Sequence, residues 1–305
     1  MRNAFSKAIF ELSKKNKDCA LLVGDIGNKL FDDFKSEHSD RFVNCGISEA
    51  NMTGVAAGMA MNGFKPFTYT IAPFNTYRCL EQIKIDVCYH NLPVTIVGTG
   101  AGLSYSSLGA THHTMEDIAI MRSLPNMKVV CPGDPVEVQL AVKEAYKEKG
   151  PVYIRLGKKG EPIIHKKKPI FKIGKAIEMA KGREIMIISV GNVFSIANEC
   201  FEILNNKHIS TGLVSLHTVK PLDAKYLKKI INFTKKIVVI EEHGFTGGAL
   251  STLLEFCHTE NLDQKKIFGF NSPDKFISFV GNQENARKSI GLTVKNIIKK
   301  IFDKL

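Results

Sequence analysis

Short apolar runs alternate with longer stretches of helical periodicity through the first half of the chain. Val, Ile and Leu dominate the short runs, and the stretches between them repeat apolar residues at three- and four-residue spacing. This alternation is typical of parallel strands that are buried on both faces and covered by helices. We predict strands at 20–26, 41–46, 66–71, 94–100, 127–131 and 151–156, and helices at 47–62, 74–90 and 135–149.

The composition changes after residue 156. Residues 157–172 read GKKGEPIIHKKKPIFK, and this wealth of Lys, Pro and Gly is typical of a linker. The alternation then resumes, with strands predicted at 184–190, 210–216, 237–241 and 266–270 and helices at 193–206, from 248, and at 283–302. We therefore predict an α/β protein of two domains, residues 1–160 and 173–305, each with a mainly parallel sheet covered by helices.

Composition limits the partners and the cellular compartment that we expect for the protein. The chain has 305 residues and a net charge of +12, but its lysines are spread out and accompany no nucleic-acid-binding motif, so we predict no nucleic-acid partner. Residues 1–18 lack the apolar core of a signal peptide and favour an amphipathic helix. No apolar run reaches membrane-spanning length, so we predict no membrane partner. The seven cysteines lie singly, which favours reduced thiols in the cytoplasm.

Polar and Gly-rich segments follow three of the predicted strands, at residues 24–28, 46–49 and 98–114. Parallel sheets bind ligands outside the carboxyl ends of their strands, so these loops are the expected site. Glu49 stands where a strand gives way to a helix. It is either a first-turn carboxylate favoured by the helix dipole or a catalytic carboxylate, and the local pattern allows both.

His112 and His113 lie in the longest of these loops, and such loops are usually functional. Adjacent histidines cannot face the same way on a helix, which makes them poor paired metal ligands. A metal held with Glu116 and Asp117 is the alternative interpretation, although we predict no metal site on this chain.

Six segments, taken in order, resemble the transketolase family. They are GISEANM at 46–52, TIAPFNTYR at 70–78, GATHH at 109–113, ED at 116–117, RSLPN at 122–126 and GDPVE at 133–137. Each motif is weak alone, but their shared order and spacing make the combination specific, and the resemblance extends over essentially the whole chain. It implies a thiamine diphosphate-binding pyrimidine domain followed by a transketolase C-terminal domain. Deoxyxylulose-phosphate synthase and the beta subunits of 2-oxo acid dehydrogenases share the pattern and remain alternatives.

The chain begins where the second domain of that family begins. The resemblance therefore implies the C-terminal subunit of a split transketolase, which transfers a two-carbon ketol unit between sugars or sugar phosphates. The N-terminal partner would carry the family's Gly-Asp-Gly…Asn signature, which binds magnesium and diphosphate, in an α₂β₂ particle. Residues 24–28, GDIGN, are only superficially similar, because their asparagine follows too closely for two loops to meet at one ion.

The resemblance also assigns cofactor contacts, residue by residue. Glu49 matches the catalytic glutamate that hydrogen-bonds nitrogen N1′ of the cofactor pyrimidine. Phe74 matches the aromatic residue that stacks on the pyrimidine, and Tyr77 an accompanying contact. Asp25 lies on a loop that the family uses near the cofactor.

Substrate contacts are implied in the same way. His112 matches a catalytic histidine that contacts sugar oxygens, His113 replaces the family's glutamine, and Lys158 stands where an arginine holds the substrate phosphate. Leu108 replaces an aspartate that reads an acceptor hydroxyl. An apolar side chain cannot bond that hydroxyl, so a modified sugar is the expected substrate.

Overall fold

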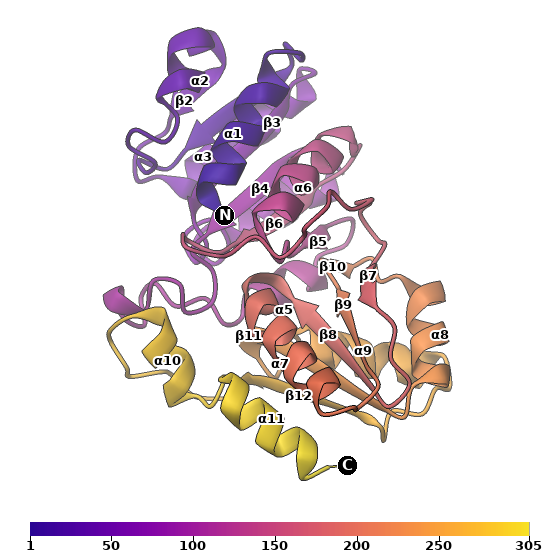
Figure 1. The fold of residues 1–305 in the computed structure, drawn as a ribbon. Helices are drawn as coiled ribbons and strands as arrows, with labels where there is room; N and C mark the ends of the chain where they lie inside the picture. Colours follow the sequence, from indigo (N-terminus) through magenta and orange to yellow (C-terminus); the bar gives the residue numbers. More distant parts are fainter. Residues whose placement is uncertain (305) are drawn as a thin grey trace.

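The computed structural model describes residues 1–304 as two α/β domains, one above the other in Figure 1. The first contains α1 (Arg2–Ser13), β1 (Cys19–Val23), α2 (Asp32–Glu37), η1 (Ser39–Arg41), β2 (Phe42–Asn44), α3 (Glu49–Met61), β3 (Lys65–Ile71), α4 (Leu80–Gln82), the π-helix η2 (Ile83–Tyr89), β4 (Thr95–Thr99), η3 (Ser106–Leu108), α5 (Asp117–Ser123), β5 (Lys128–Val130), α6 (Pro135–Lys147) and β6 (Val152–Leu156). The second contains β7 (Ile177–Ala180), β8 (Ile185–Val190), η4 (Gly191–Val193), α7 (Phe194–Asn206), β9 (Thr211–Ser215), β10 (Thr218–Lys220), α8 (Ala224–Phe233), β11 (Lys236–Gly244), α9 (Ala249–Thr259), β12 (Ile267–Ser272), α10 (Gln283–Ser289) and α11 (Val294–Phe302).

Both sheets are mainly parallel, as predicted. The first has the strand order β10-β5-β6-β4-β3-β1-β2, in which β1 to β6 run parallel. Its last strand, β10, comes from the second half of the chain and pairs antiparallel with β5. The second sheet has the order β12-β11-β8-β9-β7, and only its edge strand β7 is antiparallel. The backbone hydrogen bonds between β10 and β5 therefore join the two domains.

Strand β1 shows how the core is divided. All five of its residues are buried. Leu21 and Val23 face a core that includes Phe5 of α1 and Val138 of α6, whereas Leu22 faces a second core. That second core runs without interruption into the other domain, because side chains of both sheets contribute to it. The continuous apolar core holds the domains in one arrangement, in addition to the shared strand.

Two predicted helices differ from the structure. Residues 74–79 form turns, and the helix begins only at Leu80. The amide of Asn75 is buried and donates to the Val97 carbonyl at 2.9 Å, which anchors the turn to β4. The single helix predicted at 283–302 was wrong. Gly291 takes a φ of +76°, which ends the first helix, and Thr293 caps the second.

The segment 157–172 has no regular structure, as expected of a linker, but it is fixed to the first domain. The carboxylate of Asp134, at the N-terminus of α6, accepts hydrogen bonds from the backbone of Ile164 and His165. The His165 ring is buried 2.8 Å from a Glu137 oxygen. This hydrogen bond to Glu137 raises the pKa of His165, although burial opposes the shift.

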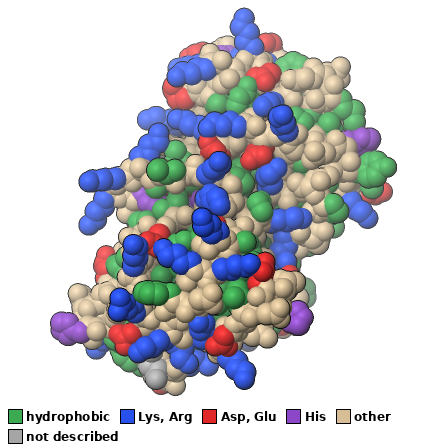
Figure 2. Space-filling view, turned by 90° about the vertical axis from the view of Figure 1, so that its right-hand side faces the viewer, with side chains coloured by type: hydrophobic (Ala, Val, Ile, Leu, Met, Phe, Trp, Pro, Cys, Tyr) green, Lys and Arg blue, Asp and Glu red, His purple; other side chains and the backbone are tan. Residues whose placement is uncertain are grey.

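Within residues 1–304, no helix is long and apolar enough to cross a membrane. All seven cysteines are free thiols, as expected. On the face drawn in Figure 2, Lys and Arg side chains are scattered over both domains with acidic side chains among them, rather than gathered in one patch.

A buried ion pair lies where the domains meet. Arg155, near the end of β6, donates from Nε to Asp117 Oδ2 at 2.8 Å, and Tyr153 donates to the same oxygen at 2.6 Å. Arg155 Nη2 also donates to the carbonyls of Thr114 at 3.0 Å and Glu242 at 2.9 Å. Arg155 is 3% exposed and Asp117 0%. One guanidinium therefore joins β6, α5 and the second domain.

Replacing Arg155 with Met should lower the free energy of unfolding by about 3–5 kcal/mol, because the Asp117 carboxylate would stay buried without its countercharge. The measurement is urea unfolding followed by circular dichroism. The matched control is Arg183→Met, at an exposed arginine, which should cost less than about 0.5 kcal/mol. A loss below about 1 kcal/mol for Arg155→Met would contradict the importance given to this pair.

Candidate active site

Glu49 is the first residue of α3 and is buried, with 1% exposure. The loop after β1 makes room for it at Gly24. A Cβ added there would lie 3.6 Å from the Glu49 Cγ and 3.1 Å from the Thr70 side chain. The hydroxyl of Thr70 is itself buried and has no hydrogen-bond partner among the described residues. The Glu49 side chain is therefore buried at the carboxyl ends of β1 and β3, beside Gly24 and close to Thr70.

Arg78 is the charged partner of Glu49. Its Nη1 donates to Glu49 Oε2 at 2.9 Å, and its guanidinium carbon lies 4.3 Å from the centroid of the Phe74 ring. A flat cation thus stacks on the aromatic ring while it bonds the buried carboxylate. The sequence does not indicate this pairing, because Arg78 lies 29 residues from Glu49 and in a segment whose periodicity predicts a helix.

His112 also contacts Phe74. The His112 and Phe74 rings meet edge to face, with centroids 5.1 Å apart. Tyr105 lies 6.1 Å from His112, and Lys158 Nζ lies 4.2 Å from the Tyr105 ring centroid. Four residues predicted from the sequence thus lie in one row of contacts, here called the Glu49 row: Glu49, Phe74, His112 and Lys158. Arg78 links Glu49 to Phe74, and Tyr105 links His112 to Lys158; neither of these two was predicted.

The electrostatics of the row favour a neutral imidazole. Partial burial lowers the pKa of His112 below its ordinary value, and the nearby His113 and Lys158 lower it further. Burial is also the main cause that lowers the pKa of Lys158. At neutral pH, His112 can therefore both accept and donate a proton through its two ring nitrogens.

Three predicted residues lie outside the row. Tyr77 turns away, and its hydroxyl donates to Glu116 Oε2 at 2.7 Å. His113 is 8% exposed, and its Nε2 has no partner among the described residues. It lines a cavity of about 540 Å³ between residues 110–116 and residues 275–277 of the second domain. Asp25 is exposed and accepts a hydrogen bond from Asn44.

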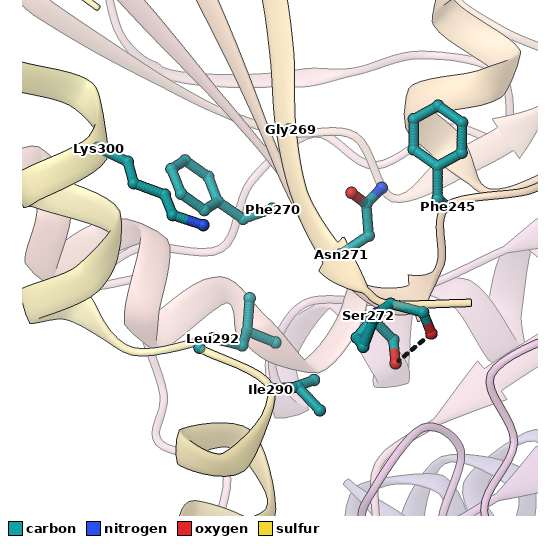
Figure 3. Close-up of a pocket in the computed structure, with 10 residues that line it drawn as sticks. Phe245, Gly269, Phe270, Asn271, Ser272, Ile290, Leu292 and Lys300 are labelled. Atoms are coloured by element: carbon teal, nitrogen blue, oxygen red, sulfur yellow. Dashed lines mark hydrogen bonds between the residues drawn. The ribbon is translucent and has the colours of Figure 1, made fainter. Parts of the chain in front are cut away.

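A separate cavity of about 330 Å³ lies wholly in the second domain, and Figure 3 shows its lining. Phe270 and Asn271 of β12 face it together with Phe245, Ile290 and Leu292, while Lys300 of α11 reaches toward it. It shares no residue with the Glu49 row and holds no acid–base group besides this lysine. The row is the better candidate for chemistry.

The row fits one half of a site for a flat heteroaromatic ring. Phe74 offers an aromatic face, and the buried Glu49 carboxylate can hydrogen-bond a ring nitrogen. The Thr70 hydroxyl has no hydrogen-bond partner among the described residues and could bond a ligand. Among residues 1–304 there is no cluster of three or more His, Cys, Asp or Glu side chains that could hold a metal.

Comparison with known families decides the relationship. Residues 1–161 match the family described as the transketolase pyrimidine binding domain, and residues 174–297 match the transketolase C-terminal domain. The chain belongs to the transketolase family. One subunit of the apulose-4-phosphate transketolase of Phocaeicola vulgatus is 32% identical over 300 residues, which cover 98% of this chain and 95% of that subunit.

A solved structure described as "Split gene transketolase, inactive beta4 tetramer" superposes with a TM-score of 0.88 at 32% identity, covering 99% of this chain and 96% of that one. The 1-deoxy-D-xylulose-5-phosphate synthase of a Geobacillus strain is 35% identical over 307 residues, but this chain covers only 47% of its length. The matched residues thus correspond to the pyrimidine-binding and C-terminal domains of the family, as the motifs predicted.

The pKa of His112 should be measurable by NMR titration of the imidazole signals, with His112→Asn for assignment. We expect a pKa below 6.5. Lys158→Met should raise it, because the loss of a nearby positive charge makes protonation easier. Lys159→Met, at an exposed neighbour, is the control and should have a smaller effect. A His112 pKa above 6.5, or a His112 pKa that does not change in Lys158→Met, would contradict these electrostatic effects.

Proposed function

We propose that this chain is the C-terminal subunit of a split, thiamine diphosphate-dependent transketolase, which transfers a two-carbon ketol unit between sugars or sugar phosphates. One observation carries the proposal: buried Glu49 and the Phe74 ring are bridged by a single flat group, the Arg78 guanidinium. A pyrimidine ring would make the same two contacts. The match in length to the Phocaeicola vulgatus transketolase subunit supports the split arrangement.

A synthase of the deoxyxylulose-phosphate type is the second candidate, because one such enzyme shares 35% identity with this chain. The paired histidines at 112–113 and the RSLPN segment at 122–126 favour a transketolase. The beta subunit of a 2-oxo acid dehydrogenase is a more distant alternative.

Glu49 would act as the catalytic carboxyl on the pyrimidine side. When bound, thiamine diphosphate supplies the carbanion chemistry. Glu49 would hold a shared proton at nitrogen N1′, and its burial would keep water away from the carboxyl. Phe74 would orient the ring. Arg78 now occupies both contacts, so its guanidinium has to leave Glu49 before the ring can bind. Tyr77 and Asp25 are proposed as peripheral cofactor contacts.

His112 would act on the substrate. Its neutral imidazole can donate a hydrogen bond to a sugar carbonyl oxygen or relay a proton from a hydroxyl. Lys158, beside Tyr105, would attract a substrate phosphate as a point charge, without the two-pronged bonding of an arginine. His113 would contact the substrate from its cavity.

The exposed Leu108 bears on the choice of sugar. Because its side chain offers no hydrogen-bonding group, we propose an acceptor that differs from ordinary pentose phosphates at the hydroxyl nearest this residue.

The rest of the site would come from an N-terminal subunit with the Gly-Asp-Gly…Asn signature, which would hold magnesium and the diphosphate. Helix α3 supports such a partner. It buries Met52, Ala56 and Ala60 against its own domain, yet leaves Val55 and Met61 exposed. We propose an α₂β₂ particle in the cytoplasm, where free cysteines stay reduced.

Glu49→Gln should preserve folding and assembly but reduce turnover by about 10²-fold or more, because the amide cannot share the carboxyl proton. The measurement is kcat of the reconstituted complex at saturating thiamine diphosphate and magnesium. Glu81→Gln, at an exposed glutamate three residues beyond Arg78, should leave kcat unchanged. If Glu49→Gln retained more than about a tenth of wild-type kcat, the role of Glu49 would be refuted.

Assembly gives the second test. Light scattering should find an α₂β₂ mass when the chain is co-expressed with a Gly-Asp-Gly-bearing partner, and cofactor-dependent transfer should appear only in that mixture. Obligate interfaces bury more than about 2,000 Å², so the particle should survive dilution. A stable, active one-to-one heterodimer, or full activity of this chain alone, would overturn the proposal.

A further inference from the structure

Glu242 is a buried residue of the second domain whose side chain contacts the first. It lies at the carboxyl end of β11 and is 0% exposed. Its carboxylate accepts a hydrogen bond from the backbone N–H of Leu103, in the first domain, at 2.7 Å. Leu103 belongs to residues 100–114, here called the histidine loop, which carries His112 and His113.

The loop backbone is shaped around this carboxylate. Gly102 has a φ of +67°, and a Cβ added to it would lie 2.3 Å from Glu242 Oε1. No other residue could let the chain pass so close to the carboxylate. The two ends of the loop meet at Gly102 and Thr114, here called its neck, where the two backbones exchange two hydrogen bonds of 3.0 Å. The neck is therefore closed at the point where Glu242 touches it.

The far end of the neck is tied to the same residue. Arg155 Nη2 donates to the carbonyl of Thr114 at 3.0 Å and to the backbone carbonyl of Glu242 at 2.9 Å. The side chain of Glu242 thus holds the start of the loop, and its main chain shares a donor with the end. His112 lies two residues before Thr114, so the neck sets where its ring stands.

Three side chains of the second domain hold the carboxylate in turn. Arg287 of α10 forms an ion pair with it. Gln283 Nε2 donates to Glu242 Oε1 at 3.0 Å, and Asn192 Nδ2 at 3.2 Å. The same two amides donate to the hydroxyl of Ser104 in the loop, each at 3.2 Å. The loop and the carboxylate therefore share one set of donors, and neither can shift alone.

We propose that Glu242, supported by Gln283 and Arg287, is a positioning residue for the reaction: through the neck of the histidine loop it fixes His112 relative to Phe74. The inference rests on the proposed function, since His112 is given its role there. It assigns the second domain a part in substrate turnover, although that domain contributes no side chain to the Glu49 row. A displacement of about 1 Å is enough to cost an oriented group roughly 100-fold in rate.

The test uses Glu242→Gln in the reconstituted two-subunit complex. Glutamine keeps the volume and one acceptor oxygen, but its NH₂ group would face the donors of Gln283 and Arg287. We expect kcat/KM for the sugar substrates to fall about 10- to 100-fold, with the Kd for thiamine diphosphate within about twofold of wild type. Hydrogen exchange should become faster in residues 102–114 and stay unchanged in the rest of both domains.

The matched control is Glu255→Gln. Glu255 of α9 pairs with Arg122 of α5 across the same domain junction, at 2.8 Å from Nη1, and does not contact the histidine loop. It should change kcat/KM by less than about twofold, since exposed ion pairs contribute little. Gln283→Ala is the milder variant to use if Glu242→Gln fails to assemble, and it should show the same loop-specific exchange with a smaller loss of kcat/KM.

Two results would overturn the inference. One is unchanged exchange in residues 102–114 together with wild-type kcat/KM in the assembled variant. The other is cofactor affinity that falls in step with activity while exchange rises throughout both domains, which would mean that Glu242 only docks the domains. Failure of the proposed function gives a different pattern: the wild-type complex would show no cofactor-dependent transfer, while the exchange measurement would still report on the loop.

Discussion

The buried pair between Arg155 and Asp117 is the interaction on which the arrangement of this protein depends. The carboxylate of Asp117 raises the pKa of Arg155 even though burial opposes the charged form. The guanidinium therefore keeps its positive charge in the buried site. Two charges removed from water stabilise a fold only when hydrogen bonds offset the loss of water. Here Tyr153 and Arg155 both donate to Asp117 Oδ2, and two carbonyls accept from the guanidinium, while the buried Asp117 Oδ1 has no hydrogen-bond partner among residues 1–304.

Those two carbonyls explain why the pair matters for more than stability. One belongs to Thr114, at the end of the histidine loop, and the other to Glu242, in the second domain. A single guanidinium thus fixes the loop and the domain that supports it. The continuous apolar core and the shared strand β10 bring the domains together, but neither is directional enough to set the orientation of one ring. Hydrogen bonds with defined angles supply that precision.

In the candidate site, a buried carboxylate is neutralised by an arginine of the same chain. Glu49 is buried and needs a countercharge, which Arg78 provides while stacking on Phe74. Arg78 is 46% exposed at its side chain, so it can leave at low cost when another group takes over both contacts. A buried carboxylate without such a partner would be penalised for the loss of water. The pairing therefore lets the chain fold with the carboxyl of Glu49, the group proposed to be catalytic, already in place.

Local pattern and motif together were enough to predict the α/β class and the parallel strands. They also singled out Glu49, Phe74, His112 and Lys158, which the structure places in one row of contacts. Strands buried on both faces leave a clear apolar signal, and residues at the ends of parallel strands meet at one edge whatever the details of packing. The helix predicted at 74–90 was wrong at its start, because the buried amide of Asn75 bonds Val97 on another strand. No periodicity reports such a contact.

The sequence by itself therefore determined the order of the elements, the edge of the sheet that carries polar groups and the identity of several of them. Only the tertiary structure decided which of those groups meet. Arg78 reaches Glu49 from 29 residues away, Arg155 reaches the carbonyl of Glu242 from 87, and Glu242 reaches Leu103 from 139. A buried charge takes whichever partner the packed chain brings within bonding distance, and that distance depends on the whole fold rather than on the neighbouring residues.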